Sequence, residues 1–272
     1  AGSFQFLSWD VHKRVQFGLF QGFIWTSTDT RNKMNLDASY FNPVLFGSAL
    51  QYGLGGAHNV LLGSTLKFKI TNSVSLYGQY LLDEIAEKSL KGSIRNKLGF
   101  QLGLKYFDVL KVKNLHLQIE YNQVRPYSYA HKNTAQNYSH YNQSLAHPIG
   151  ASFKEAIVIW NYRLADFFTE LKFQGIRLGK DSAGRNYGNN IFLSQNNAFY
   201  GVNSTINSQN QGVKTLVSFV DFKIGYLINP STNMNIVGGI SMRAEKNDRV
   251  NAQTNFVYIG FRTSLTNVYY DF

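Results

Sequence analysis

The sequence predicts an all-β fold, an antiparallel up-and-down β-barrel of about 11 to 12 strands, and three observations favour this class. Apolar and polar side chains alternate along most of the chain, as in strands with one apolar face. Aromatic residues make up 15% of the chain, and they recur at or near the expected strand ends. Hydrophobic residues reach 44%, yet no apolar run approaches the roughly 18 residues that a membrane-spanning helix requires.

The alternation is clearest in the segment 97–106, where every second residue is apolar: Leu98, Phe100, Leu102, Leu104 and Tyr106. The residues between them are polar or glycine. The same pattern recurs in the segments 62–70, 115–122 and 220–226. Because successive side chains of a strand point to opposite faces, each of these segments has one apolar and one polar face.

Turn-forming residues divide the chain into strands. The expected strands are 4–11, 15–25, 59–71, 73–83, 97–106, 115–124, 156–163, 167–177, 215–228, 233–243 and 255–272. Short links and longer links follow these strands in strict alternation, and the longer ones are 26–58, 84–96, 125–155, 178–214 and the modest 244–254.

This alternation of links is typical of bacterial outer-membrane barrels, whose short turns lie in the periplasm and whose long loops lie outside. A soluble β-sandwich is the alternative, with its apolar faces packed together and its polar faces in water. Aromatic residues at the strand ends favour the barrel, because they form girdles at membrane interfaces. The whole chain, 1–272, is therefore expected to be one barrel domain at the cell surface, embedded in the outer-membrane lipids and lipopolysaccharide.

The composition excludes several kinds of site. The sequence contains no Cys, which excludes disulfides, thiolate metal sites, iron–sulfur clusters and cysteine nucleophiles. The formal net charge of +11 indicates an acidic environment, such as lipopolysaccharide phosphates or acidic polysaccharide. Nucleic acid is not an expected partner, because no basic run or recognition motif occurs. No cofactor or metal is expected, and no catalytic motif indicates an enzyme.

Both ends of the chain bear on barrel assembly. The final residues place Val268, Tyr270 and Phe272 on one face of the last strand, which resembles the C-terminal signal read by barrel-assembly machinery. The expected strand count is odd, and the first strand precedes a short link and so begins on the outer side. Single-chain bacterial barrels have an even number of strands. We therefore expect upstream strands of the same protein, or another outer-membrane chain, to pair with the segment 4–11.

Several motifs together resemble one protein family. They lie at 6–10 (FLSWD), 121–127 (YNQVRPY), 141–148 (YNQSLAHP), 261–265 (FRTSL) and 270–272 (YDF). They resemble the RemB-like gliding-motility outer-membrane proteins of Bacteroidota, which are distantly similar to Wzi-type capsule-assembly barrels. The similarity extends over the whole chain, which looks like the C-terminal part of these longer proteins. The resemblance implies a surface protein associated with motility, adhesion or polysaccharide, and it implies no catalytic residues.

The long loop 125–155 is the first candidate site, because it combines many Tyr, His, Asn and Gln residues. In one interpretation its aromatic rings stack on sugars and its amides bind sugar hydroxyl groups. In the other, the loop folds over the barrel mouth and its aromatic residues pack there. The His spacing is irregular and matches no zinc motif, so no metal site is expected. The candidate ligand-binding residues are Tyr127, Tyr129, His131, Tyr138, His140, Tyr141 and His147.

Charged residues on the polar strand faces form the second candidate site. They are expected to line the lumen, and they are Lys67, Lys69, Lys105, Glu120, Glu170, Lys172, Asp221, Lys223, Arg243 and Arg262. In one interpretation they surround an aqueous pore, where the excess of cations would favour anions. In the other, acidic and basic side chains pair across strands and fill the lumen.

The predicted function is that of a non-enzymatic surface barrel. Its long loops would bind or anchor polysaccharide or a partner protein, in motility, adhesion or capsule assembly. An anion-biased, porin-like transport pore is one alternative. A structural subunit of a larger outer-membrane assembly is another.

Overall fold

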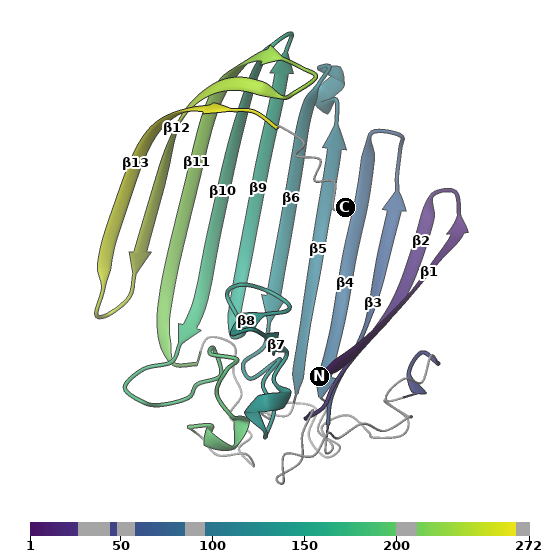
Figure 1. The fold of residues 1–272 in the computed structure, drawn as a ribbon, viewed down its shortest axis with the longest axis vertical. Coiled ribbons are helices and arrows are strands. Elements are labelled where there is room, and N and C mark those ends of the chain that lie inside the picture. The colour runs from purple at the N-terminus through teal and green to yellow at the C-terminus, as the bar shows by residue number, and fades with distance from the viewer. Residues whose placement is uncertain (27–43, 48–57, 85–95, 200–210, 265–272) are drawn as a thin grey trace, which may run out of the picture.

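The computed structural model describes residues 1–26, 44–47, 58–84, 96–199 and 211–264. In this part of the chain, eleven strands form one antiparallel sheet in which each strand pairs with the next one along the chain (Figure 1). The predicted all-β, up-and-down class is confirmed. The strands are β1 (Gly2–His12), β2 (Val15–Ile24), β3 (Asn59–Lys69), β4 (Val74–Glu84), β5 (Lys97–Phe107), β6 (Leu115–Val124), β9 (Phe153–Leu164), β10 (Phe167–Lys180), β11 (Val213–Asn229), β12 (Met234–Lys246) and β13 (Asn251–Arg262).

Short turns join the strands at one end of the sheet, and longer connections lie mostly at the other end (Figure 1). One of the long connections contains a small hairpin of β7 (Ser139–His140) and β8 (Gln143–Ser144). Single turns of 3-10 helix complete the described secondary structure: η2 (Val109–Lys111), η3 (Thr134–Gln136) and η4 (Gln195–Asn197). No helix in the described ranges is long and apolar enough to cross a membrane.

The predicted long link 244–254 is wrong. β12 continues to Lys246 and β13 begins at Asn251, so a tight turn joins them. The side chain of Asn247 closes this turn by accepting hydrogen bonds from the backbone N–H groups of Arg249 and Val250. Residues 251–255 are mostly polar on both faces, so they lack the alternation that would have revealed a strand. Short and long links therefore do not alternate strictly at this point.

The last strand also ends earlier than predicted. β13 ends at Arg262, and Thr263 and Ser264 are not in a strand, although the predicted strand includes them. Residues 265–272, with the predicted assembly signal of Val268, Tyr270 and Phe272, lie outside the described residues.

The sheet is not closed in the described part of the chain. β1 and β13 lie at opposite edges of the sheet (Figure 1), where β1 pairs with β2 and β13 pairs with β12. The expectation that upstream strands or another chain pair with β1 stays a prediction.

The register divides the sheet into two chemically different faces, because directly paired residues lie on the same face. One row of paired residues crosses from β4 to β13 and contains only apolar side chains: Val74, Tyr106, Leu117, Trp160, Leu171, Phe222, Ile240 and Val257. We call this side the apolar face. Many of its side chains are exposed, among them Leu102 at 59% and Val257 at 74%.

The opposite side is the polar face. A neighbouring row there contains Lys69, Ser75, Lys105, Gln118, Ile159, Lys172, Asp221 and Ser241. Aromatic rings of the polar face lie over glycines of adjacent strands: a Cβ added to Gly103 would meet the ring of Tyr77 at 2.2 Å. Gly103 therefore permits this close approach, which any larger residue would prevent.

Candidate functional site

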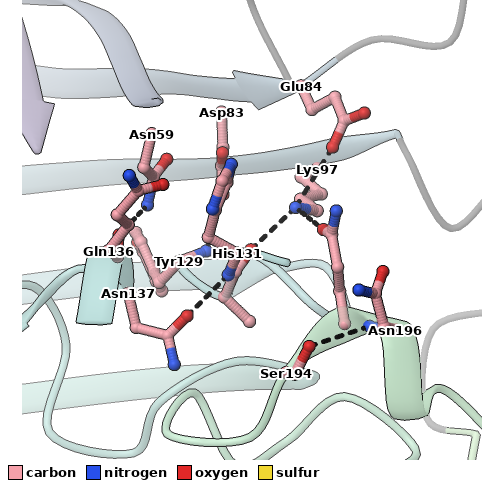
Figure 2. A network of polar contacts seen from close by, with 12 residues as sticks. Asn59, Asp83, Glu84, Lys97, Tyr129, His131, Gln136, Asn137, Ser194 and Asn196 are labelled. Carbon is pink, nitrogen blue, oxygen red and sulfur yellow. Dashed lines mark hydrogen bonds and ion pairs between the residues drawn. The ribbon is translucent and has the colours of Figure 1, made fainter. Parts of the chain in front are cut away.

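Two connections fold together over the polar face at the long-connection end of the sheet. We call them the cap, residues 125–152 and 181–199. Several contacts attach the cap to strands, and three of them involve the sites in Figure 2: the backbone N–H of Tyr129 donates to the Asp83 carboxylate at 2.7 Å, Lys97 Nζ donates to the Ala130 carbonyl at 2.8 Å, and Asn59 Nδ2 donates to the Gln136 carbonyl at 2.8 Å. Beneath the cap lies a hydrophobic cluster that includes Leu61, Leu81, Val124, Tyr129, Phe153, Leu178, Ile191 and Val217.

Lys97 joins both halves of the cap to the sheet. Its side chain is 2% exposed and forms an ion pair of 3.2 Å with Glu84. The same ammonium group also donates to the side-chain oxygen of Gln195 in the second connection (Figure 2). A buried cation is tolerated only when it is paired and hydrogen-bonded, and the cap supplies two of the three partners.

Three of the seven predicted ligand-binding residues of this loop are buried. Tyr127, Tyr129 and His131 are 1%, 4% and 4% exposed, respectively, and Tyr138 packs edge-on against Phe4. The first three side chains form the interior of the cap, as in the interpretation in which the loop packs over the barrel mouth. Ligand binding by the seven candidates stays a prediction. Burial raises the pKa of the Tyr129 phenol, helped by the negative charge of Asp83, and burial also raises the pKa of Tyr138.

The remaining candidates of this loop lie nearer the surface. His140 and Tyr141 belong to the β7–β8 hairpin, and Tyr141 is 87% exposed. His147 lies 3.0 Å from the Glu155 carboxylate, which also accepts hydrogen bonds from Asn122 and Gln174. His147 therefore fixes the cap to β9.

A cavity of about 680 Å³ opens between the two connections of the cap. We call it the cap pocket. Four amide side chains and one hydroxyl group contribute to its lining, which consists of Asn142, Gln143, Ser144, Pro148, Ile149, Gly150, Lys180, Asp181, Asn189, Asn190, Ile191 and Phe192. Several acceptors are already used inside the protein: the Asp181 carboxylate accepts hydrogen bonds from the backbone N–H groups of Tyr187 and Asn190. Asp181 thereby shapes one wall of the pocket.

The other wall is the β7–β8 hairpin. Tyr141 and Asn142 form its two-residue turn with φ values of 46° and 59°, the conformation of a type I′ turn. In the described residues no hydrogen bond involves the side-chain amides of Asn142 and Gln143, so these groups are available to a ligand. The sequence indicates Tyr141 as a candidate ligand residue and the motif 141–148 as part of the family resemblance. It does not indicate Asn189, Asn190 and Phe192, because only the fold brings the two connections together.

The ten predicted lumen residues all lie on the polar face. The register places them there: Lys67, Lys69, Lys105, Glu120, Glu170, Lys172, Asp221, Lys223, Arg243 and Arg262. Lys223 pairs with Glu170 at 2.7 Å, and Arg243 pairs with Glu245 at 2.7 Å. In the described residues, Lys67, Lys69, Lys105 and Lys172 form no ion pair. The expectation that this face encloses a lumen stays a prediction.

No group of three or more His, Cys, Asp or Glu residues that could hold a metal ion occurs in the described ranges. Sequence reasoning missed the buried polar residues Asp83, Glu84, Lys97 and Glu155, because they lie at or beyond predicted strand ends. Their partners come from the cap or from distant strands, and no local pattern identifies them.

Comparison with solved structures gives weak structural likenesses. The chain is similar to the crystal structure of Pseudomonas aeruginosa OprD, with a TM-score of 0.44 and 10% sequence identity. The alignment covers 97% of this chain and 61% of the OprD chain, so this chain spans less than two thirds of that length. No family model matches the sequence, and no curated protein matches it. None of these comparisons shows the resemblance to RemB-like or Wzi-type proteins.

Proposed function

We propose that this chain forms part of the wall of an outer-membrane β-barrel and binds a saccharide, without catalysis, in the cap pocket. The observation that carries the proposal is the amide-lined pocket on a cap that closes over the polar face of a membrane-type sheet.

The two faces of the sheet support the membrane location. The apolar face carries large exposed side chains on strand after strand, including Leu102, Phe222, Ile236 and Ile259. Soluble proteins rarely expose contiguous apolar surface of this extent, whereas a barrel wall presents it to lipid. A β-sandwich would cover this face with a second sheet, and the described residues form only one large sheet.

The connections support one orientation. Short turns face the periplasm and longer loops face outward in bacterial barrels, and this general pattern favours a cap at the cell surface. The cap pocket would then be open to extracellular ligands.

The lining of the cap pocket supports a saccharide as the ligand. Amide side chains offer both donors and acceptors, which matches the paired donor and acceptor character of sugar hydroxyl groups. Phe192 is a partly exposed ring in the pocket and Tyr141 is exposed beside it, and such rings can pack on the apolar face of a sugar. The saccharide would be a surface polysaccharide that the barrel anchors, and the link to gliding motility or capsule rests on the family resemblance alone.

The test is binding of soluble surface polysaccharide to the detergent-solubilised protein, measured by calorimetry. The double variant Asn142→Gly/Gln143→Ala should weaken binding about tenfold or more, because two hydrogen-bonding amides are lost. Glycine suits position 142, where φ is 59°. Asn196→Ala is the matched control, an exposed cap amide outside the pocket. Equal affinity of all three proteins, or no binding by the unchanged protein, would contradict the proposal.

An anion-biased pore is the second candidate, and the lysines of the polar face without ion pairs favour it. Lys67, Lys69, Lys105 and Lys172 would attract anions in an aqueous lumen. Reversal potentials in planar bilayers test this function: replacing these four lysines with Gln should shift the permeability ratio away from anions. Absence of any conductance would leave the barrel without a transport role.

A further inference from the structure

A small group of cations interrupts the apolar face near the cap end of the sheet. In the described strands, the register places only four Lys, Arg, Asp or Glu residues on this face: Lys154, Arg177, Lys214 and Lys246. All four lie on neighbouring strands, β9 to β12. The apolar faces of β2 to β6 carry no such charge in the described residues.

Three of these cations lie in one row across the sheet. Lys154 is directly opposite Arg177, and both Arg177 and Lys246 are opposite Leu216 on the strand between them. With neighbouring strands about 4.8 Å apart, the row extends over roughly 15 Å. The span exceeds that of a single phosphate group.

Among the described residues, these cations have no counter-charge. Throughout the described ranges, no hydrogen bond or ion pair involves the charged groups of Lys154, Arg177 or Lys246. The adjacent carboxylates Glu155 and Glu245 lie on the opposite face, where they have partners of their own. The row therefore presents unneutralised positive charge outward.

A cavity of about 700 Å³ lies beside the row on the same face. The three cations line it, and its floor is a directly paired row of small residues: Ala156, Gly175, Ser218 and Ala244. The next row towards the middle of the strands is bulky and contains Val158, Phe173, Val220 and Met242. The cavity is thus a shallow groove with a cationic rim on its cap side and an apolar floor.

We propose that this groove binds a phosphorylated lipid of the outer leaflet, with its phosphate groups on Lys154, Arg177 and Lys246 and an acyl chain on the apolar floor. The inference rests on the proposed membrane location. Charge complementarity identifies the occupant, because basic pockets beside an apolar membrane-facing surface recognise anionic headgroups. The row is longer than one phosphate, which favours a headgroup that carries two.

The probe is a phosphatidylcholine vesicle or nanodisc that contains a bisphosphorylated glycolipid, compared with the same membrane without it. Lipid that remains bound to the solubilised full chain is measured by native mass spectrometry. The triple variant Lys154→Gln/Arg177→Gln/Lys246→Gln should retain less than about a tenth of the glycolipid, since the three cations that attract its phosphate groups are lost. Lys13→Gln/Lys111→Gln/Lys113→Gln is the matched control, with the same change in net charge at the short-turn end, and it should retain the lipid.

A second variant tests the floor of the groove. Ala244→Leu adds no charge but fills the cavity, and it should also reduce lipid retention. The proposal is overturned if the triple variant and the control retain the lipid equally. It is also overturned if inorganic phosphate displaces the lipid fully, or if the protein retains an acidic protein in preference to the lipid. Vesicle flotation separates the two hypotheses: failure to insert refutes the membrane location, whereas normal insertion without lipid retention refutes only the lipid site.

Discussion

Lys97 shows how a charged side chain can be buried beneath the cap. Lys97 contacts Glu84 on the neighbouring strand, Ala130 in one half of the cap and Gln195 in the other. The sequence shows Lys97 as one polar residue at the start of a strand, and nothing nearby in the sequence indicates its burial. Residues whose partners lie far away along the chain cannot be recognised by periodicity, which reports only local alternation.

Lys97→Met should therefore destabilise the cap strongly. The substitution leaves the buried Glu84 carboxylate without its counter-charge, and breaking a buried ion pair in this way costs about 3–5 kcal/mol. Limited proteolysis should show rapid cleavage within residues 125–152, while the sheet stays resistant. Lys67→Met is the control, because Lys67 is exposed and forms no ion pair in the described residues. Adding Glu84→Gln to Lys97→Met should restore part of the protection, and equal cleavage of the two single variants would disprove this role of Lys97.

The buried tyrosines give the cap a pH dependence. Burial raises the pKa values of Tyr129 and Tyr138 above the ordinary value of 10.0. At neutral pH both phenols are protonated in the folded and unfolded cap, so they do not affect its stability there. Above pH 10.0 the phenols of an unfolded cap ionise while the buried ones resist ionisation, so the free energy of unfolding falls as the pH rises.

Proteolysis of the cap should accordingly accelerate above about pH 10. The variant Tyr129→Phe/Tyr138→Phe removes both ionisable groups and should show a smaller acceleration. An unchanged pH profile in this variant would show that other groups control the alkaline opening of the cap.

Individual strands were the most predictable elements. β6 matches its predicted bounds of 115–124, and most other strands differ only near their ends. Strong alternation of apolar and polar residues fixed the faces, because a shift of one residue would exchange them. The start of β13 was missed for the opposite reason: residues 251–255 offer little contrast between faces, and only pairing with β12 makes them a strand.

The assignment of faces predicts opposite effects of neighbouring substitutions in β5. Leu102 lies on the apolar face and is 59% exposed, whereas Gln101 lies on the polar face opposite Gln79 and Asn122. Leu102→Arg should cost about 2–4 kcal/mol if this position is near the middle of the bilayer. Gln101→Arg should be tolerated. The folded band in unboiled gels measures both variants, and equal loss of that band would mean that the two faces do not divide lipid from water.

At the scale of the whole molecule, the sequence predicted one up-and-down sheet but not how its connections fold. The two connections of the cap are joined by contacts such as the hydrogen bond from Asn189 Nδ2 to the Ala151 carbonyl at 2.7 Å, and the cap pocket lies between these connections. Of the two sequence interpretations of the Tyr-rich loop, packing over the sheet describes the buried rings of Tyr127 and Tyr129. Ligand binding by the loop stays a prediction. The sheet also has two open edges, β1 and β13. In lipid, each unpaired backbone N–H or C=O group of a strand edge costs several kcal/mol, so a membrane location requires partners for both strands.

The orientation of the whole sheet can be tested at its two ends. An epitope inserted between Tyr141 and Asn142 enters the exposed turn of the β7–β8 hairpin, whereas Asn137 is buried and would not accept an insertion. If the cap is at the cell surface, antibody should label this epitope on intact cells. An epitope inserted after Lys113, in the turn between β5 and β6, should be labelled only after permeabilisation. Labelling of the second epitope on intact cells and of the first only after permeabilisation would invert the topology, and it would place the cap pocket and the cationic groove on the periplasmic side.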